Sequence, residues 1–270
     1  FEEGERGDWS RLYFYNTDPG SYLNYCEFRY GGRSNSSPYY CPQLDIYSSD
    51  LAINNCKVSF GYRSGISIDS GSDTTITNGS ITDNYYYGLI VESNANPSVT
   101  GVTLSGNSSS NLNVPAGLLE SYVSTNNVET GEKIYISGGV ISTDTTWPDI
   151  GEAKYYVTGD IRIFEGGKLT IPPGSSLYQP AKIQVYSNAA LKIGANSFFD
   201  RPGEIIVDQN AELEIGAGTI FKLQRADLYN FSIQGTIKAN GTSANPIVFT
   251  SYKDDSTGGN TNGGSAFEEG

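Results

Sequence analysis

The stretch that decides the fold is Ile53-Asn54-Asn55-Cys56-Lys57-Val58, because its pattern recurs twice further along the chain. The pattern returns at Ile76-Thr77-Asn78-Gly79-Ser80-Ile81 and again at Val99-Thr100-Gly101-Val102-Thr103-Leu104, with the same offset each time. A second series of apolar pairs keeps this offset: Ile66/Ile68, Leu89/Val91 and Leu112/Val114. Alternation of this kind is typical of strands with one buried face. The first half of the chain therefore predicts short strands that recur with a 23-residue period.

The second half repeats independently, with a 22-residue period. Three apolar series carry this period: Ile161/Ile163, Ile183/Val185 and Ile205/Val207; Leu169/Ile171, Leu191/Ile193 and Leu213/Ile215; Leu177, Phe199 and Phe221. Three series per period predict three strands per turn, with successive turns stacked so that equivalent residues form inward ladders. We therefore predict an all-β, parallel solenoid with one set of turns over residues 1–138 and a second over residues 139–270.

Other repeat folds fit this pattern less well. A left-handed hexapeptide helix needs a six-residue internal period, and a leucine-rich repeat carries a fixed Asn ladder with helical backs. An Ig-like or jelly-roll sandwich is the remaining alternative, but it does not predict constant spacing over several turns. An earlier turn over residues 23–28 lies further from Ile53 than one regular period, so we expect a longer loop within residues 33–42.

The composition of the chain argues against several classes of function. A formal charge of −13 argues against nucleic acid as a partner, because phosphate binding needs clustered Lys and Arg. No apolar run approaches the roughly 18 to 20 residues that span a bilayer, so we expect no membrane span. The chain has no His, which removes the commonest general base and metal ligand. A chain rich in Ser, Thr, Asn and Tyr is compatible with an extracellular or cell-surface location, which we expect.

Three further stretches have a recognisable pattern: Gly167-Lys168-Leu169-Thr170-Ile171-Pro172-Pro173-Gly174, Asn245-Pro246-Ile247-Val248-Phe249-Thr250-Ser251 and Leu23-Asn24-Tyr25-Cys26-Glu27-Phe28-Arg29-Tyr30-Gly31-Gly32. They resemble turns of the pectin-lyase-like right-handed parallel β-helices of secreted bacterial proteins. The resemblance implies a right-handed helix. It leaves function open, because this family contains both lyases and inert surface repeats.

The order of these motifs differs from the order in the family, since the turns that usually open the helix lie in the middle of this chain. The chain also begins with Phe1-Glu2-Glu3-Gly4 and ends with Phe267-Glu268-Glu269-Gly270. We interpret this as a unit repeated head to tail, with open ends at Leu12/Phe14 and Ile247/Phe249 that bind further copies. The predicted function is a structural repeat of an extracellular filament or long surface protein. The alternative is a polysaccharide-binding or polysaccharide-cleaving β-helix.

One acidic pair is a candidate for catalysis. Asp69 and Glu92 occupy the same position in successive turns, so their carboxylates could lie one strand spacing apart, as in a retaining glycosidase. The same spacing suits a solvated turn in an acidic protein, and our first interpretation assigns no catalytic residue.

Two further expectations concern metal and disulfide chemistry. Asp254, Asp255, Asn260 and Asn262 lie in a Gly-rich stretch that resembles a degraded calcium loop, although a plain polar loop explains it as well. We expect that no cofactor is required, and calcium is the one candidate ion. Cys26 and Cys56 fall on equivalent positions of adjacent turns, where they would form either a disulfide or stacked free thiols.

Overall fold

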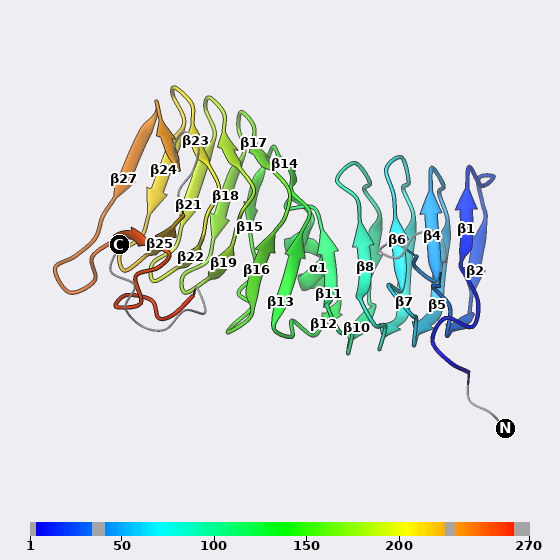
Figure 1. The fold of residues 1–270 in the computed structure, drawn as a ribbon. Coiled ribbons are helices and arrows are strands. Elements are labelled where there is room, and N and C mark those ends of the chain that lie inside the picture. Colours follow the sequence, from blue (N-terminus) through cyan, green and yellow to red (C-terminus); the bar gives the residue numbers. More distant parts are fainter. Residues whose placement is uncertain (1–3, 34–40, 225–229, 262–270) are drawn as a thin grey trace. The chain divides into compact units, whose positions relative to one another are not determined.

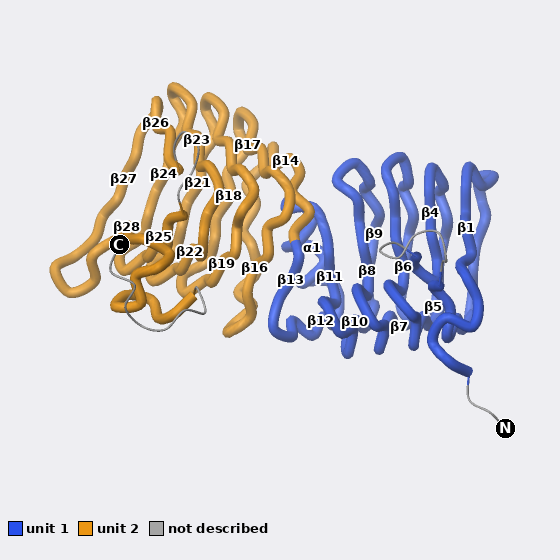
Figure 2. The backbone as a smooth tube through the Cα atoms, in the orientation of Figure 1, with its two compact units in different colours: residues 1–135 blue, residues 136–270 orange. Residues whose placement is uncertain are grey.

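The structure, a computed structural model, describes residues 4–33, 41–224 and 230–261. The chain divides into two compact units, residues 1–135 and residues 136–270 (Figure 2). Within each unit short parallel strands stack turn upon turn (Figure 1). Each unit is a right-handed parallel β-helix, as the two periods and the resemblance predict.

Unit 1 contains two parallel sheets. The first, sheet A1, has the order β1 (Leu12–Tyr15), β4 (Leu44–Tyr47), β6 (Ile66–Ile68), β8 (Tyr87–Val91), β11 (Ser110–Val114) and β13 (Lys133–Ile136), and β13 runs across the boundary between the units. The second, sheet B, contains β2 (Tyr22–Asn24), β3 (Glu27–Arg29), β5 (Ala52–Ser59), β7 (Thr75–Thr82), β9 (Ser98–Thr100), β10 (Thr103–Ser105) and β12 (Asn127–Val128).

Unit 2 contains three parallel sheets. Sheet A2 has the order β16 (Lys154–Val157), β19 (Ser176–Tyr178), β22 (Phe198–Asp200), β25 (Ile220–Leu223) and β28 (Val248–Ser251). Sheet C is formed by β14 (Gly139–Ile141), β17 (Ile161–Ile163), β20 (Ile183–Val185), β23 (Ile205–Val207) and β26 (Phe231–Ile233). Sheet D is formed by β15 (Asp144–Thr146), β18 (Lys168–Ile171), β21 (Ala190–Ile193), β24 (Glu212–Ile215) and β27 (Thr236–Ala239).

The three strands per turn are separate in unit 2 but partly fused in unit 1. β5 pairs with both β2 and β3, and β7 pairs with both β9 and β10, so each of these long strands replaces two short ones. The corner inside these long strands consists of residues with positive φ, Asn55 (52°) in β5 and the pair Asn78 (59°) and Gly79 (89°) in β7. Asn and Gly tolerate this conformation better than most residues. One left-handed residue in β5 and two in β7 therefore turn the chain without a loop.

The apolar ladders read from the sequence form the cores of the units. Ile66, Leu89 and Leu112 in sheet A1 are at most 1% exposed, as are Leu177 and Phe199 in sheet A2. The pairing registers join the same residues that the periods join, for example Ile66 to Leu89 and Leu177 to Phe199. The repeat thus predicts the inward residues correctly.

A chain of buried amides crosses the turns of unit 1. Gln43 Nε2 donates to Asn84 Oδ1 at 2.9 Å, Asn84 Nδ2 to Asn107 Oδ1 at 2.9 Å, and Asn107 Nδ2 to Asn111 Oδ1 at 2.5 Å. Asn84 and Asn107 occupy the same position in successive turns, and the equivalent position one turn earlier is Gly61. A Cβ on Gly61 would lie 2.7 Å from Asn84 Oδ1 and 2.9 Å from Gln43 Nε2, so these two amides fill the space that an asparagine side chain would take.

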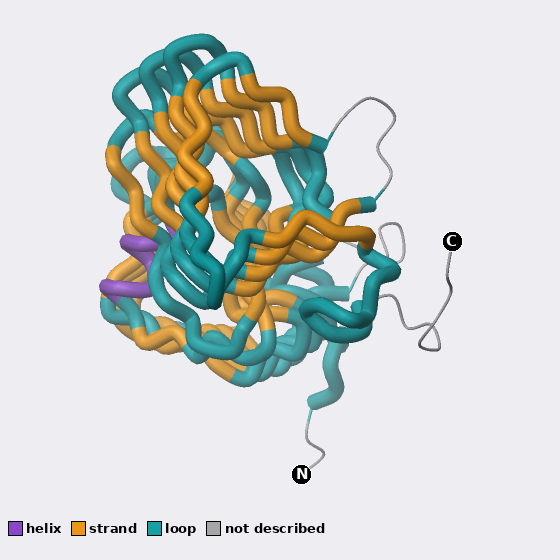
Figure 3. Tube along the Cα trace, turned by 90° about the vertical axis from the view of Figure 1, so that its left-hand side faces the viewer, coloured by secondary structure: helices purple, strands orange, loops and turns teal. Residues whose placement is uncertain are grey.

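A short helix interrupts the strand pattern. α1 (Leu119–Thr125), purple in Figure 3, packs on β9 with Leu119 and Tyr122 buried. Tyr122 lies one regular period after Val99, so α1 stands where the next copy of β9 is expected. The Tyr122 hydroxyl donates to the Pro97 carbonyl at 2.8 Å. Within the described residues, no helix has the length and apolar character to cross a bilayer.

Candidate functional site

The outer face of sheet A1 brings two tyrosines and two carboxylates into one row. Tyr15 pairs with Tyr47, and the pairs Ile46–Ile68 and Ile68–Val91 place Asp69 and Glu92 in the following two turns of the same row. Because Ile68 and Val91 are fully buried and point inward, the residue after each points outward. Backbone hydrogen bonds fix this register, since the Glu92 amide donates to the Ile68 carbonyl at 3.0 Å. The neighbouring position of Asp69 and Glu92 is as the sequence predicts.

Asp45 is buried and Asp69 and Glu92 are half-buried, so water is partly excluded from the carboxylates on this face. Burial raises the pKa of Asp69, with the Ser67 hydroxyl and the Arg11 charge opposing it. Burial also raises the pKa of Glu92, and the neighbouring Asp69 charge adds to the rise. The pKa of Asp45 is raised by burial and by Asp69, against the lowering effect of Arg11. Each of these three acids therefore stays protonated to a higher pH than the same acid in water.

This geometry has a definite chemical capability. Carboxylates on adjacent strands are about 4.8 Å apart at the backbone, close to the roughly 5 Å that separates the acid and the nucleophile of retaining glycosidases. A raised pKa favours an acid that can donate a proton. These properties fit glycoside cleavage, but they equally follow from crowding acidic residues on a partly buried surface.

A cation that the sequence analysis overlooked lies beside these acids. Arg11 Nη1 forms an ion pair with Asp45 Oδ2, and its guanidinium lies 5.0 Å from the centre of the Tyr13 ring. Asp45 is 6% exposed although it points outward between the inward residues Leu44 and Ile46. Inward apolar residues alternate with outward residues over 11–15 and 44–47, and this alternation places Arg11 and Asp45 on the outer face.

Tyrosine rings line the same face towards the first turn. The rings of Tyr13 and Tyr15 are stacked with centroids 5.9 Å apart, and those of Tyr15 and Tyr47 are stacked at 5.6 Å. Tyr13 is 52% exposed and Tyr15 is 56% exposed. Such exposed rings offer an apolar face with a polar tip, which suits contact with a sugar ring or with another protein.

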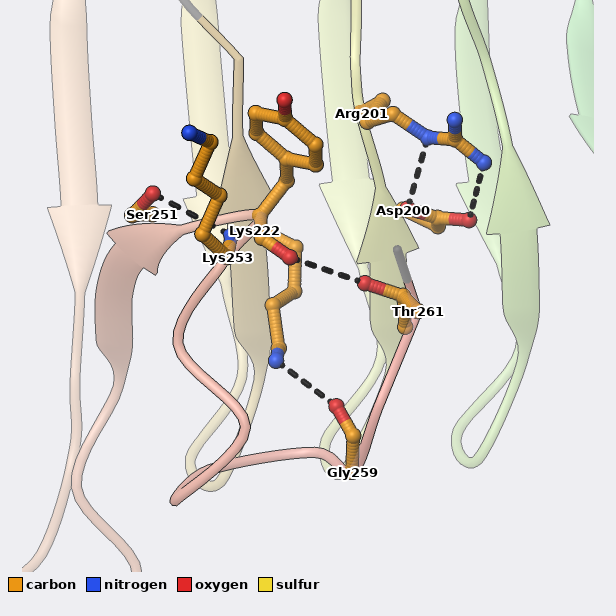
Figure 4. Close-up of polar contacts among 8 residues, drawn as sticks. Asp200, Arg201, Lys222, Ser251, Lys253, Gly259 and Thr261 are labelled. Carbon is orange, nitrogen blue, oxygen red and sulfur yellow. Dashed lines mark hydrogen bonds and ion pairs between the residues drawn. The ribbon is translucent and has the colours of Figure 1, made fainter. Parts of the chain in front are cut away.

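The outer face of sheet A2 is covered by the segment after β28. Lys222 is fully buried at an outward position, and its ammonium group donates to the carbonyl oxygen of Asp254. It also donates to the Gly259 carbonyl oxygen at 2.8 Å (Figure 4). The Thr261 hydroxyl donates to the Tyr252 carbonyl at 3.2 Å, which holds the far end of the segment. We call residues 252–261 the strap.

The expected calcium ligands lie in this strap. The Asp254 carboxylate accepts hydrogen bonds from the hydroxyl groups of Ser256 and Thr250, which with the Ser256 amide lower its pKa. Backbone carbonyl oxygens are calcium ligands in many proteins. In this strap two of them, from Asp254 and Gly259, accept hydrogen bonds from the Lys222 ammonium group instead. Among the described residues no three His, Cys, Asp or Glu side chains gather as a metal site, and Asn262 lies outside them. Calcium binding by Asp254, Asp255 and Asn260 stays a prediction.

Comparison with known families agrees with this architecture. A family model described as a right handed beta helix region matches residues 44–171, and one described as a pectate-lyase like beta helix domain matches residues 184–266. The two matches, each over part of the chain, support the pectin-lyase-like family of right-handed parallel β-helices. No match was found among curated proteins or solved structures.

The first turn of unit 1 and the last described turn of unit 2 expose residues of a kind that internal turns bury. Leu12 in β1 is 41% exposed, whereas its partner Leu44 in the next turn is fully buried. Phe249 in β28 is 47% exposed, whereas its partner Phe221 is fully buried. Phe14 and Ile247 are partly buried. The four residues expected at the ends therefore lie on the first and last turns that the structure describes.

The cysteines lie in the first turns of unit 1. Cys26 and Cys56 occupy adjacent turns, and the Cys26 amide donates to Cys56 Sγ at 3.4 Å. Both of them, and Cys41, are free thiols in the structure. Burial raises the pKa of the Cys41 and Cys56 thiols, which disfavours the reactive thiolate. A disulfide between Cys26 and Cys56 stays a prediction.

Proposed function

We propose that the chain is a structural repeat unit of an extracellular filament or long surface protein, in which units join end to end through open turns of the β-helix. The observation that carries this proposal is the exposure of inward apolar residues, Leu12 in the first turn and Phe249 in the last. Solenoids need terminal turns with polar outer faces to remain soluble as separate bodies. Apolar terminal turns instead favour a further turn stacked upon them.

The direction of the joint follows from the strands. Among the described residues, β1 and β28 each pair along one edge only within sheets A1 and A2. Unpaired strand edges bind further strands. β1 is the first strand of sheet A1, and β28 is the last described strand of sheet A2. Pairing β28 of one copy with β1 of the next copy uses two different surfaces, so the contact is heterologous and need not close into a ring. Repetition of such a contact builds a rod.

The inward ladder supports the same joint. Ile220 and Phe221 pair with Val248 and Phe249, so the last described turn continues the ladder of large apolar residues. A further turn placed on β28 would need an apolar residue over Phe249. Leu12 is the first member of the ladder in sheet A1, where it pairs with Leu44. We therefore place Leu12 of one unit over Phe249 of the preceding unit.

Analytical ultracentrifugation of the 270-residue chain tests this proposal. We expect the average mass to rise with concentration, and Leu12→Lys or Phe249→Lys to abolish the rise, because each variant blocks one end. Mixing the two variants should give dimers and nothing larger, because only one pair of intact ends remains. The matched control is Val140→Lys, since Val140 is 49% exposed on the outer face of sheet C. A wild-type chain that stays monomeric at high concentration would refute the proposal.

A second function is favoured by the row on sheet A1. The raised pKa values of Asp69 and Glu92, together with the tyrosine stack in the same row, support polysaccharide binding or cleavage there. Release of reducing or unsaturated ends from acidic polysaccharides would detect cleavage. Loss of that release in both Asp69→Asn and Glu92→Gln would establish the enzymatic alternative, and absence of release by the wild-type chain would exclude cleavage of the polysaccharides used.

A further inference from the structure

Two arginines occupy the same position in adjacent turns of unit 1, at the corner where the chain leaves sheet B and enters sheet A1. The Tyr62 amide donates to the Gly31 carbonyl at 2.8 Å, and this register aligns Arg33 with Arg63. Strands in adjacent turns are about 4.8 Å apart. Like charges at directly opposed positions repel each other, so this arrangement costs stability unless an anion lies between them.

One tyrosine ring contacts both guanidinium groups. The guanidinium carbon of Arg33 lies 5.9 Å from the centre of the Tyr62 ring, and that of Arg63 lies 5.5 Å from it. Gly7 packs against the Arg33 side chain, since a Cβ there would lie 3.0 Å from the Cβ and Cδ of Arg33. The ring and the glycine thus hold the two charged groups at one place on the surface.

A third arginine joins them. Arg6 Nη1 donates to the Gly61 carbonyl at 2.9 Å, and its guanidinium lies 5.8 Å from the centre of the Phe60 ring. Phe60 and Gly61 immediately precede Tyr62 in the chain. Arg6 thus bonds to the residue before Tyr62 and precedes Gly7, which contacts Arg33; we call these three arginines, with Phe60 and Tyr62, the arginine corner.

The arginine corner is positively charged, whereas the chain as a whole is acidic. The protein has 30 acidic residues against 17 basic ones, and Arg11, Arg29 and Arg201 each pair with a carboxylate. In the part of the chain that the structure describes, no ion pair within 4 Å involves Arg6, Arg33 or Arg63. Because no described carboxylate forms an ion pair with these three arginines, their guanidinium groups are available to an external anion.

We propose that the arginine corner is an oxyanion-binding site, in which the guanidinium groups of Arg33 and Arg63 bind one carboxylate, sulfate or phosphate group. The planar guanidinium fork donates two parallel hydrogen bonds to such groups, and charge-assisted bonds of this kind are about twice as strong as neutral ones. Arg6 adds a third charge, and the Tyr62 ring provides a flat wall for the body that carries the anion. A bound oxyanion also removes the repulsion between Arg33 and Arg63.

Nuclear magnetic resonance titration with sodium sulfate and sodium phosphate tests the site, with chloride adjusted to hold the ionic strength constant. We expect saturable shifts of the Nε–H signals of Arg33 and Arg63. Arg33→Gln combined with Arg63→Gln should weaken binding by about tenfold or more, as expected for loss of charged hydrogen bonds. The Lys substitutions at both positions keep the charge without the fork, and should weaken binding less. Arg29→Gln is the matched control, because Arg29 already pairs with Glu27.

A second arm identifies the source of the oxyanion. Sulfated and carboxylated oligosaccharides are compared with a neutral oligosaccharide of the same length and with the inorganic anions. Tighter binding of an anionic oligosaccharide assigns the site to a glycan, whereas equal affinity assigns it to a free anion. Shifts that do not saturate, or an affinity unchanged in a folded Gln double variant, would overturn the proposal. Thermal unfolding of each variant establishes that it is folded.

Discussion

Removal of Asn84 from the buried amide chain should destabilise unit 1 more than its small side chain suggests. Asn84 Oδ1 accepts hydrogen bonds from Gln43 Nε2 and from the Gly61 amide, both at 2.9 Å, and its Nδ2 donates to Asn107 Oδ1. Both Gln43 and Asn84 are fully buried, so water does not replace these bonds. In Asn84→Ala the Gly61 amide loses its partner among the described residues.

The magnitude follows from the groups that are left without a partner. Each buried polar group left unsatisfied costs about 1 to 3 kcal/mol, and Asn84→Ala strands the Gly61 amide and one hydrogen of the Gln43 amide. We therefore expect the free energy of unfolding to fall by about 2 to 6 kcal/mol. At a slope of about 2 kcal/mol/M, the urea midpoint should fall by about 1 to 3 M.

Urea unfolding followed by far-ultraviolet circular dichroism measures this loss, with hydrogen exchange at the Gly61 amide as a local readout. The matched control is Asn24→Ala, which removes the exposed hydrogen bond from Asn54 Nδ2 to Asn24 Oδ1 and should cost less than about 1 kcal/mol. Equal losses in the two variants would refute the reasoning that burial sets the cost.

The same chain of amides allows a rescue experiment. Gln43→Ala should destabilise unit 1, and Gly61→Asn alone should also do so, because its Cβ would lie 2.7 Å from Asn84 Oδ1 and 2.9 Å from Gln43 Nε2. Combined, the two substitutions place an asparagine at position 61, so that the regular step from Asn84 to Asn107 extends one turn further back. We expect the double variant to be more stable than the sum of the single effects predicts. Strict additivity would show that Gln43 does not replace the missing asparagine.

Three further predictions concern charge, the strap and the thiols. Because the pKa of Asp69 is raised on folding, its ionisation costs stability as pH rises from its unfolded to its folded pKa; Asp69→Asn should flatten this fall in pH-dependent melting. Lys222→Met should release the strap at a local cost of about 2 to 4 kcal/mol, seen as faster hydrogen exchange over residues 252–261, whereas Lys253→Met should not. Oxidation by glutathione disulfide should join Cys26 to Cys56 and raise stability by about 3 to 4 kcal/mol, seen by non-reducing mass spectrometry and urea unfolding.

Each of these predictions has an outcome that contradicts it. An unchanged pH profile in Asp69→Asn would mean that the carboxylate is hydrated in solution. Equal exchange in the Lys222 and Lys253 variants would mean that the ammonium group does not hold the strap. A mass for the oxidised chain that still contains both thiols would show that Cys26 and Cys56 stay reduced.

The fold could be predicted from the sequence because its inward residues are nearly all determined by one requirement. A residue such as Ile68 must stack on Val91 in the next turn, so apolar residues recur at the period of the turn. The corners were less predictable. Asn55 turns β5 without a loop, and nothing in the apolar pattern separates that corner from a strand interior. The helix α1 was missed because Tyr122 keeps the expected spacing while the backbone around it changes type.

The candidate sites show why outward residues are harder to predict than inward ones. Asp69 and Glu92 could be recognised as neighbours because they immediately follow members of an apolar ladder at the regular step. Lys222 could not, since it is buried by a strap that comes from beyond β28 and obeys no period. The alignment of Arg33 with Arg63 could be predicted in part, because it depends on a longer step than the regular period. The step that separates them is also the step from Cys26 to Cys56, so the register that aligned the cysteines aligns the arginines as well.

The stacking of the core thus determines which outward residues become neighbours, and these neighbours form the candidate sites. A substitution at an outward position leaves the stacking of the core unchanged, so neighbouring turns are free to differ in the groups they display. In sheet A1 this freedom places Tyr15, Tyr47, Asp69 and Glu92 in one row, and at the arginine corner it places two like charges together. Stability alone does not favour either arrangement, because both crowd polar or charged groups. The ends differ in kind, since Leu12 and Phe249 belong to the inward ladder itself. A variant that blocks an end should therefore alter assembly without altering the arginine corner, and a variant of the corner should alter anion binding without altering assembly.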